Sequence, residues 1–122
     1  MKAFSDIEQS ERLAKILPPE SADMYWKNGV SDKYIQCFTP FVINEYGTDV
    51  NLDYDVPCWS LAALLEIIRK PTALNLLING RGYRCHCTDK SEGKFHGTDD
   101  YCDNAIDACI EVIIKLHEQK LI

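Results

Sequence analysis

The 122-residue sequence predicts an α+β fold: a small antiparallel sheet made of hairpins, with about three helices packed mainly on one of its faces. Helical and extended segments alternate along the chain, and the connections between extended segments are short and rich in turn residues. Short connections favour antiparallel neighbours over parallel crossovers. With 46% hydrophobic residues, the chain is expected to form a single domain, residues 1–122, that buries a core without help from metals or disulfides.

The first helix is expected over residues 6–17. Ser5 and Glu8 have the spacing of a capping box, in which a serine oxygen accepts a hydrogen bond from a first-turn amide and the glutamate reaches back to the serine N–H. Apolar residues recur along one side of this helix, and that side is expected to pack against the core. Pro18 and Pro19 end the helix, because neither can donate a backbone hydrogen bond.

Three extended segments are expected next. Residues 22–26 and 34–38 are separated by a stretch containing Asn28 and Gly29, a pair that accepts the positive φ angles of a hairpin turn. Residues 49–56 alternate polar and apolar side chains, with acidic and amide groups on one face. This alternation predicts a half-exposed strand.

A second helix is expected over residues 58–69, with Pro57 in a favoured starting position and Pro71 closing the segment. Leucine and isoleucine recur in it at spacings of three and four residues, so one side should face a core. After it, two extended runs flank the turn sequence NGRG, residues 79–82, which predicts a hairpin. A short extended run is expected at residues 94–96.

The last helix is expected over residues 104–119 and should be central to the core. Its apolar residues cover more than a single stripe. Ile110 and Ile113 are expected to be fully buried, and His117 is expected on the apolar side. Any part of this surface left open would mark a site for a partner or for self-association, so the protein is expected to be a monomer or a homodimer.

Charge narrows the class of partner. Nineteen acidic residues against thirteen basic ones give a net charge of −6, the wrong sign for binding nucleic acid or an anionic membrane surface. The N-terminal segment has charges where a secretory signal needs a continuous apolar core, and no apolar run reaches the length of a membrane span. These observations predict a cytoplasmic protein whose six cysteines are reduced thiols.

Cys58 is the residue that most resembles an enzymatic nucleophile. It precedes Trp59, as in papain-like cysteine proteases, and a thiol at the N-terminus of a helix has its thiolate favoured. However, Val56 and Pro57 replace the Gly-Ser type of approach, and Leu52 stands where those enzymes have a glutamine. A small buried residue is the favoured interpretation. A Cys58-dependent hydrolase or transferase, working with one of the histidines, is the alternative.

A zinc-binding module is a second alternative. Cys85 and Cys87 point to the same side of an expected strand, and His96 and Cys102 follow closely enough to complete four ligands of the type zinc prefers. Structural zinc sites usually present two Cys-x-x-Cys pairs, or one such pair with two histidines, and this spacing is irregular. Buried thiols are therefore favoured. No catalytic residue, metal ligand or cofactor-binding residue is predicted.

Three segments carry a resemblance to a known family: SDIEQSERLAKILPPESADMYW, WSLAALLEII and DNAIDACIEVIIKLHEQKLI. Together they resemble a family of small uncharacterised proteins of gut anaerobes and their phages or mobile elements, over nearly the whole chain. The family pattern tolerates alanine at Cys58 and does not include the run from Cys85 to Cys87. No activity or cofactor is established for that family, so the resemblance implies none.

Taken together, these features predict a non-enzymatic accessory or regulatory protein. It is expected to act through an unknown protein partner, without nucleic acid or membrane, and to derive from a phage or mobile element.

Overall fold

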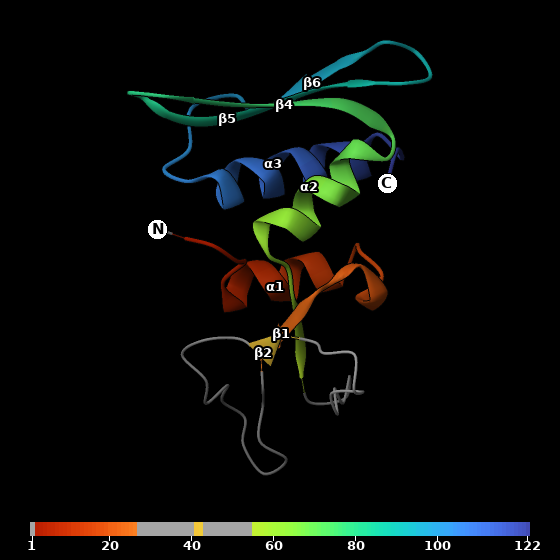
Figure 1. Ribbon diagram of the computed structural model, residues 1–122. Coiled ribbons are helices and arrows are strands. Elements are labelled where there is room, and N and C mark those ends of the chain that lie inside the picture. Colours follow the sequence, from red (N-terminus) through yellow and green to blue (C-terminus); the bar gives the residue numbers. More distant parts are fainter. Residues whose placement is uncertain (1, 27–40, 43–54) are drawn as a thin grey trace. The chain divides into compact units, whose positions relative to one another are not determined.

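The computed structural model describes residues 2–26, 41–42 and 55–122 (Figure 1). These residues form three α-helices and two small antiparallel sheets, each with three strands. The α+β class predicted from the sequence is therefore confirmed, with the strands divided between two sheets. Contacts group the chain into two compact units: Phe4–Ser60, and Leu61–Ile122 together with Met1–Ala3.

The unit Phe4–Ser60 pairs one helix with a small sheet. Its elements are α1 (Ile7–Ala14), a 3₁₀ turn (Pro19–Ser21), β1 (Met24–Trp26), β2 (Phe41–Val42) and β3 (Val56–Cys58). The strand order is β2-β1-β3, and both pairings are antiparallel. Helix α1 packs against β3. The expected strand at residues 34–38, its turn at Asn28 and Gly29, and residues 49–54 of the third expected strand lie outside the described residues.

The capping box of α1 is made by different residues from those predicted. The carboxylate of Asp6 accepts the N–H of Gln9 at 2.8 Å, and the Gln9 side chain accepts the N–H of Asp6 at 3.1 Å. The prediction of Ser5 and Glu8 is wrong, because the Ser5 hydroxyl is buried and accepts the backbone N–H of Trp59 at 3.0 Å. The helix therefore begins one residue later than a serine cap would place it.

The predicted start of the second helix is also wrong. Pro57 and Cys58 belong to β3, where Pro57 lies opposite Tyr25 of β1. An edge strand tolerates proline, since the missing N–H can face away from the ladder. Helix α2 (Leu61–Arg69) begins only after Ser60, whose N–H donates to the Asp23 carboxylate at 2.9 Å. Pairing with β1 thus keeps the chain extended where the local sequence favours a helix.

Asp55 departs from the predicted pattern as well. The alternation of residues 49–56 placed it on an exposed acidic face, but its exposed fraction is 3%. The residue directly precedes β3, and tertiary packing there overrides the alternation.

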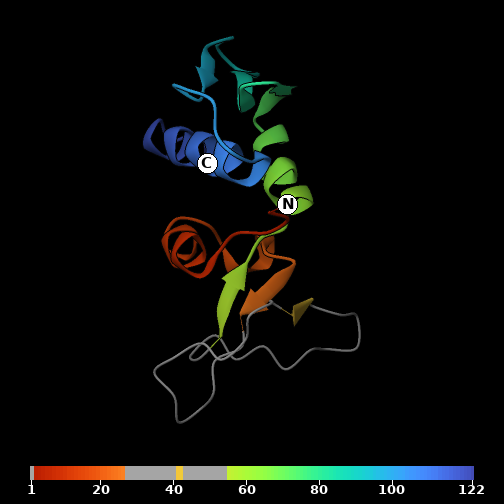
Figure 2. The same ribbon diagram turned by 90° about the vertical axis from the view of Figure 1, so that its left-hand side faces the viewer.

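The unit Leu61–Ile122 has two helices on one face of a sheet (Figures 1 and 2). Besides α2, its elements are β4 (Thr72–Asn79), β5 (Gly82–Asp89), β6 (Phe95–Gly97) and α3 (Ala105–Glu118). The strand order is β4-β5-β6, so β4 and β6 are the two edges. Helix α2 packs against β4, and α3 packs against β5 and β6.

The predicted hairpin at residues 79–82 is confirmed. Asn79 pairs with Gly82, and β4 and β5 stay in register along all eight residues of each strand. Gly82 has a φ of +125°, and a Cβ at this position would overlap the carbonyl oxygen of Cys102. The closing glycine is thus required by both the backbone angle and the close approach. The short strand expected at residues 94–96 is observed one residue later.

Helix α3 is central to its unit, as predicted. Asn104 caps it by accepting the N–H of Asp107 at 2.8 Å. The exposed fractions of Ile110 and Ile113 are 3% and 0%, which confirms the prediction that both are buried. His117 is exposed instead of packed. Leu116 takes the buried position of the last turn, and the helical step of about 100° carries the next residue toward solvent.

Candidate functional site

Cys58 is the last residue of β3, before the start of α2 at Leu61, and it is fully buried. Its thiol donates to the carbonyl oxygen of Ser5 at 3.3 Å, and the Ser5 hydroxyl lies 3.5 Å from the sulfur. Burial raises the pKa of the Cys58 thiol above its ordinary value. The protonated thiol is therefore favoured at neutral pH, which disfavours a nucleophile.

The groups around Cys58 form a buried network of hydroxyls and indoles. The hydroxyls of Ser5 and Ser10 lie 2.7 Å apart, and the indole N–H of Trp26 donates to Ser10 at 3.2 Å. Trp59 donates its indole N–H to the hydroxyl of Ser21 at 2.9 Å. These bonds satisfy polar groups inside the unit. The unit holds no histidine, because all three histidines of the sequence lie beyond residue 60.

The proposed zinc ligands are not brought together. Cys85 and Cys87 are both buried on the inner side of β5, which confirms that they point the same way. His96 lies opposite Cys87 in the ladder, whereas the thiol of Cys102 donates to Glu111 at 3.6 Å. Among the residues that the structure describes, no three histidine, cysteine or acidic side chains form a group suited to a metal ion.

Three thiols of this unit, those of Cys85, Cys87 and Cys102, also have raised pKa values. Burial raises the pKa of Cys87 and of Cys102 to about 11. The pKa of Cys85 is raised as well, mainly by a hydrogen bond with Cys109 of α3 and secondly by burial. All five cysteines of the described residues are free. Cys37 lies outside them.

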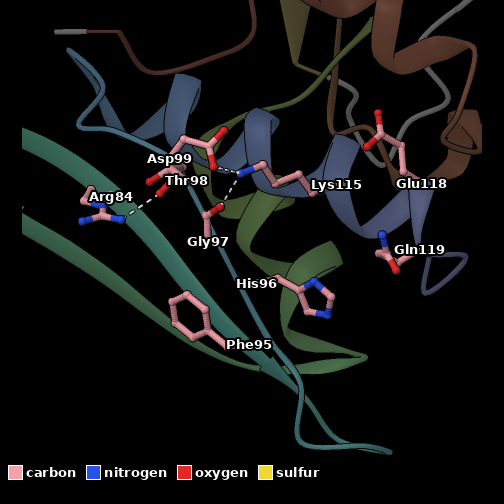
Figure 3. Close-up of a pocket in the computed structure, with 9 residues that line it drawn as sticks. All are labelled: Arg84, Phe95, His96, Gly97, Thr98, Asp99, Lys115, Glu118 and Gln119. Atoms are coloured by element: carbon pink, nitrogen blue, oxygen red, sulfur yellow. Dashed lines mark hydrogen bonds and ion pairs between the residues drawn. The ribbon is translucent and has the colours of Figure 1, made fainter.

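A polar pocket of about 430 Å³ lies between β6 and the C-terminal half of α3 (Figure 3). Lys115 extends across it and donates to the Gly97 carbonyl at 2.7 Å and to the Asp99 carboxylate at 2.8 Å. From β5, Arg84 donates to the Thr98 carbonyl at 2.9 Å. Groups from β6 and the residues after it thus already bind both cations.

Three residues that line this pocket have buried polar atoms without a hydrogen-bond partner: Arg84 Nε, His96 Nε2 and Thr98 Oγ1. His96 Nε2 lies 3.5 Å from the carboxylate of Asp89. Because all three atoms are buried, a ligand in the pocket would reach them only after the lining side chains moved. This pocket is therefore a weaker candidate than the opposite edge of the sheet.

That opposite edge is β4, a strand of eight residues with the sequence TALNLLIN. It carries no charged side chain. The N–H of Lys90 donates to the carbonyl of Pro71 at 2.9 Å, which makes residues 71 and 90 a hydrogen-bonded pair of the ladder. Because such pairs alternate along an antiparallel ladder, the backbone groups of Leu74, Leu76 and Ile78 point away from β5. In the described part of the chain, no strand pairs with this side.

A small apolar pocket of about 170 Å³ lies beneath the turn end of β4. Most of its lining is apolar, from Leu61, Leu76, Ile78, Tyr83 and Ala105. Ile78 is 66% exposed, a large fraction for a side chain of this type. The edge thus combines unpaired backbone groups with a cavity suited to one aliphatic side chain.

Basic residues stand at both ends of this edge. Arg69 and Lys70 precede β4 and Arg81 follows it, and all three are exposed. Arg69 is bound to the Glu66 carboxylate at 2.6 Å. Within the described residues, Lys70 and Arg81 form no ion pair. A chain with a net charge of −6 therefore places two available cations beside an uncharged strand.

The edge of β4 was not predicted as a binding site from the sequence. The uncharged run of residues 72–79 and the basic residues around it are visible in the sequence. A hairpin sequence does not show which of its two strands will stay unpaired on the outer side. That depends on β6, which pairs with β5 and leaves β4 at the edge.

Comparison of the chain with protein-family models, with curated proteins and with solved structures gave no match in any of the three. Among the helices of the described residues, none has the length and apolar character needed to cross a membrane.

Proposed function

We propose that this protein is a non-enzymatic accessory or regulatory protein that acts by binding a partner protein, and that the outer edge of β4 is its binding element. The observation that carries the proposal is the unpaired, uncharged edge of eight residues. An extended segment of a partner can add to such an edge as a further strand, with backbone hydrogen bonds giving the affinity. The backbone groups of Leu74, Leu76 and Ile78 would accept it.

The cellular setting belongs to the same proposal. The cytoplasmic location is supported by the free thiols of the described residues. An origin in a phage or mobile element is supported by the resemblance of the segments that begin at Ser5, Trp59 and Asp103.

The β4 proposal is tested with a synthetic peptide of alternating threonine and valine residues, capped at both ends and free of charge. Titration into the ¹⁵N-labelled protein is expected to shift the amide resonances of Leu74, Leu76 and Ile78. Ile78→Pro should abolish these shifts, because it removes an outward N–H while leaving the bonds to β5. Ile78→Val keeps the N–H and should bind. Shifts that lie elsewhere, or that persist in Ile78→Pro, would overturn the proposal.

The enzymatic alternative is tested by the reactivity of Cys58. Because burial raises the pKa of this thiol, alkylation at neutral pH is expected to be slow, and slower than that of the part-exposed Cys102. Mass spectrometry of peptides after timed alkylation separates the two sites. Fast modification of Cys58 at neutral pH would indicate a depressed pKa and would favour the Cys58-dependent hydrolase or transferase.

A further inference from the structure

The chemistry around β4 narrows the kind of segment that the proposed edge accepts, an inference that rests on the proposed function. The strand is uncharged, and its inward row of side chains ends at Ile78 above the apolar pocket. Alternate side chains of an added strand point to the same face. An aliphatic side chain on that face of the partner can therefore enter the pocket.

The ends of the edge favour negative charge. Lys70 stands just before β4 and Arg81 just after it, so an added segment of similar length ends near one cation at each side. Opposite charges on neighbouring strands stabilise a pairing, and like charges destabilise it. Acidic residues at the two ends of the partner segment complement both cations.

A second copy of the chain fits this edge poorly. In a two-fold antiparallel pairing of β4 with itself, the outward-facing residues of one copy lie opposite those of the other. The registers in which the two strands overlap most are then centred on Asn75 or on Leu76. Both registers bring Lys70 of one copy within one residue of Arg81 of the other, at both ends of the pairing. Four cations would then gather around two uncharged strands.

We infer that the partner of β4 is an extended aliphatic segment of another protein, flanked at both ends by acidic residues. The edge supplies backbone hydrogen bonds, the apolar pocket takes one aliphatic side chain, and Lys70 and Arg81 select the charge of the flanks. Charge selection of this type depends on ionic strength, because both cations are exposed.

The test compares two peptides that share the alternating threonine–valine core, one with a glutamate at each end and one with a lysine at each end. At low salt, the glutamate peptide is expected to bind about tenfold more tightly, and the preference should shrink as salt rises. Replacing Lys70 and Arg81 by glutamine should remove the preference. Lys94→Gln combined with Lys120→Gln, which removes the same two positive charges at exposed positions outside β4, serves as the control and should keep the preference.

The outcomes separate this inference from the proposed function. Equal binding of the two peptides at β4 would overturn the charge selection and leave strand addition standing. Binding of neither peptide, nor of the uncharged one, would overturn both. Sedimentation gives the remaining outcome: a dimer that Ile78→Pro converts to monomer would show that the edge is occupied by a second copy, which contradicts the inference.

Discussion

The two edges of the β4-β5-β6 sheet differ in how they are protected. Strand β6 has three residues, and Lys115 of α3 donates to the carbonyl of its last residue, Gly97. Strand β4 has eight residues and no charge, and in the described part of the chain no strand pairs with its outer side. Short strands and lysines are usual means by which proteins prevent edge-to-edge association. Among the described residues, one edge of the sheet is therefore protected by these means and the other is not.

The cations near the two edges also differ in their bonding. At β6, the cations Arg84 and Lys115 are bound by groups of the same sheet margin. At β4, Lys70 and Arg81 stand beside the strand without an ion pair in the described residues. Cations used for internal bonds stabilise the fold, whereas unpaired ones remain available to select a partner.

The largest effect on stability is expected from a substitution in α3, the helix that packs beneath the sheet. Ile113 is fully buried on α3, which packs against β5 and β6. Ile113→Ala should lower the free energy of unfolding by about 2–5 kcal/mol, because a buried cavity replaces the lost side chain. Denaturant unfolding measures the change. Ile114→Ala, at a part-exposed position, is the control and should cost less; equal stability of Ile113→Ala and the wild type would mean that the core is wrongly placed.

A lysine on β4 should make this edge behave like β6. Ile78→Lys places a charge on the open edge and removes one wall of the apolar pocket, so binding of the uncharged peptide is expected to weaken at least about tenfold. Calorimetric titration measures the affinity. Ala73→Lys adds the same charge where the side chain is on the opposite face of the strand, and should bind as the wild type does. Similar losses in both variants would attribute the effect to net charge instead of the edge.

The opposite change should make β6 more like β4. Lys115→Met removes the donor to Gly97 and is expected to cost about 1 kcal/mol or less, because the bond is partly exposed. Amide hydrogen exchange in residues 95–97 should become faster, with exchange in β4 unchanged. Lys120→Met, at an exposed position after α3, is the control. Unchanged exchange at residues 95–97 would show that Lys115 does not protect this edge.

At low pH, the segment of residues 90–97, which includes β6, should lose stability before β4 does. The Asp89 carboxylate accepts the N–H groups of Glu92, Gly93 and Lys94, and the first of these contributes most to lowering its pKa. A lowered pKa in the folded state means that this stabilisation is present above the ordinary value of about 4 and is lost as pH falls through the folded value. The protection factors of the amides in residues 90–97, which correct for the slower intrinsic exchange in acid, should therefore decrease as pH falls.

The uncharged strand β4 provides the internal reference for this measurement, and Asp89→Asn should flatten the dependence on pH. Equal acid sensitivity in β4 and β6, with no effect of the substitution, would contradict the role assigned to the Asp89 carboxylate.

Much of the fold could be predicted from the sequence wherever a local interaction decides the structure. The hairpin at residues 79–82 and the burial of Ile113 follow from turn chemistry and helical periodicity. The candidate site was predictable only in part. The absence of charge in β4 is a property of residues 72–79, but its place at the edge is not.

Three features follow from the amino-acid sequence alone: the α+β class, the elements near their observed positions in the second half of the chain, and the shared side of a strand for the thiols of Cys85 and Cys87. Tertiary structure decided the surroundings of Cys58, because pairing with β1 holds residues 56–58 extended and Ser5 is drawn inside to bond with Trp59. It also decided which edge stays open, because the strand that covers a hairpin is chosen by long-range pairing, and no local pattern encodes that choice.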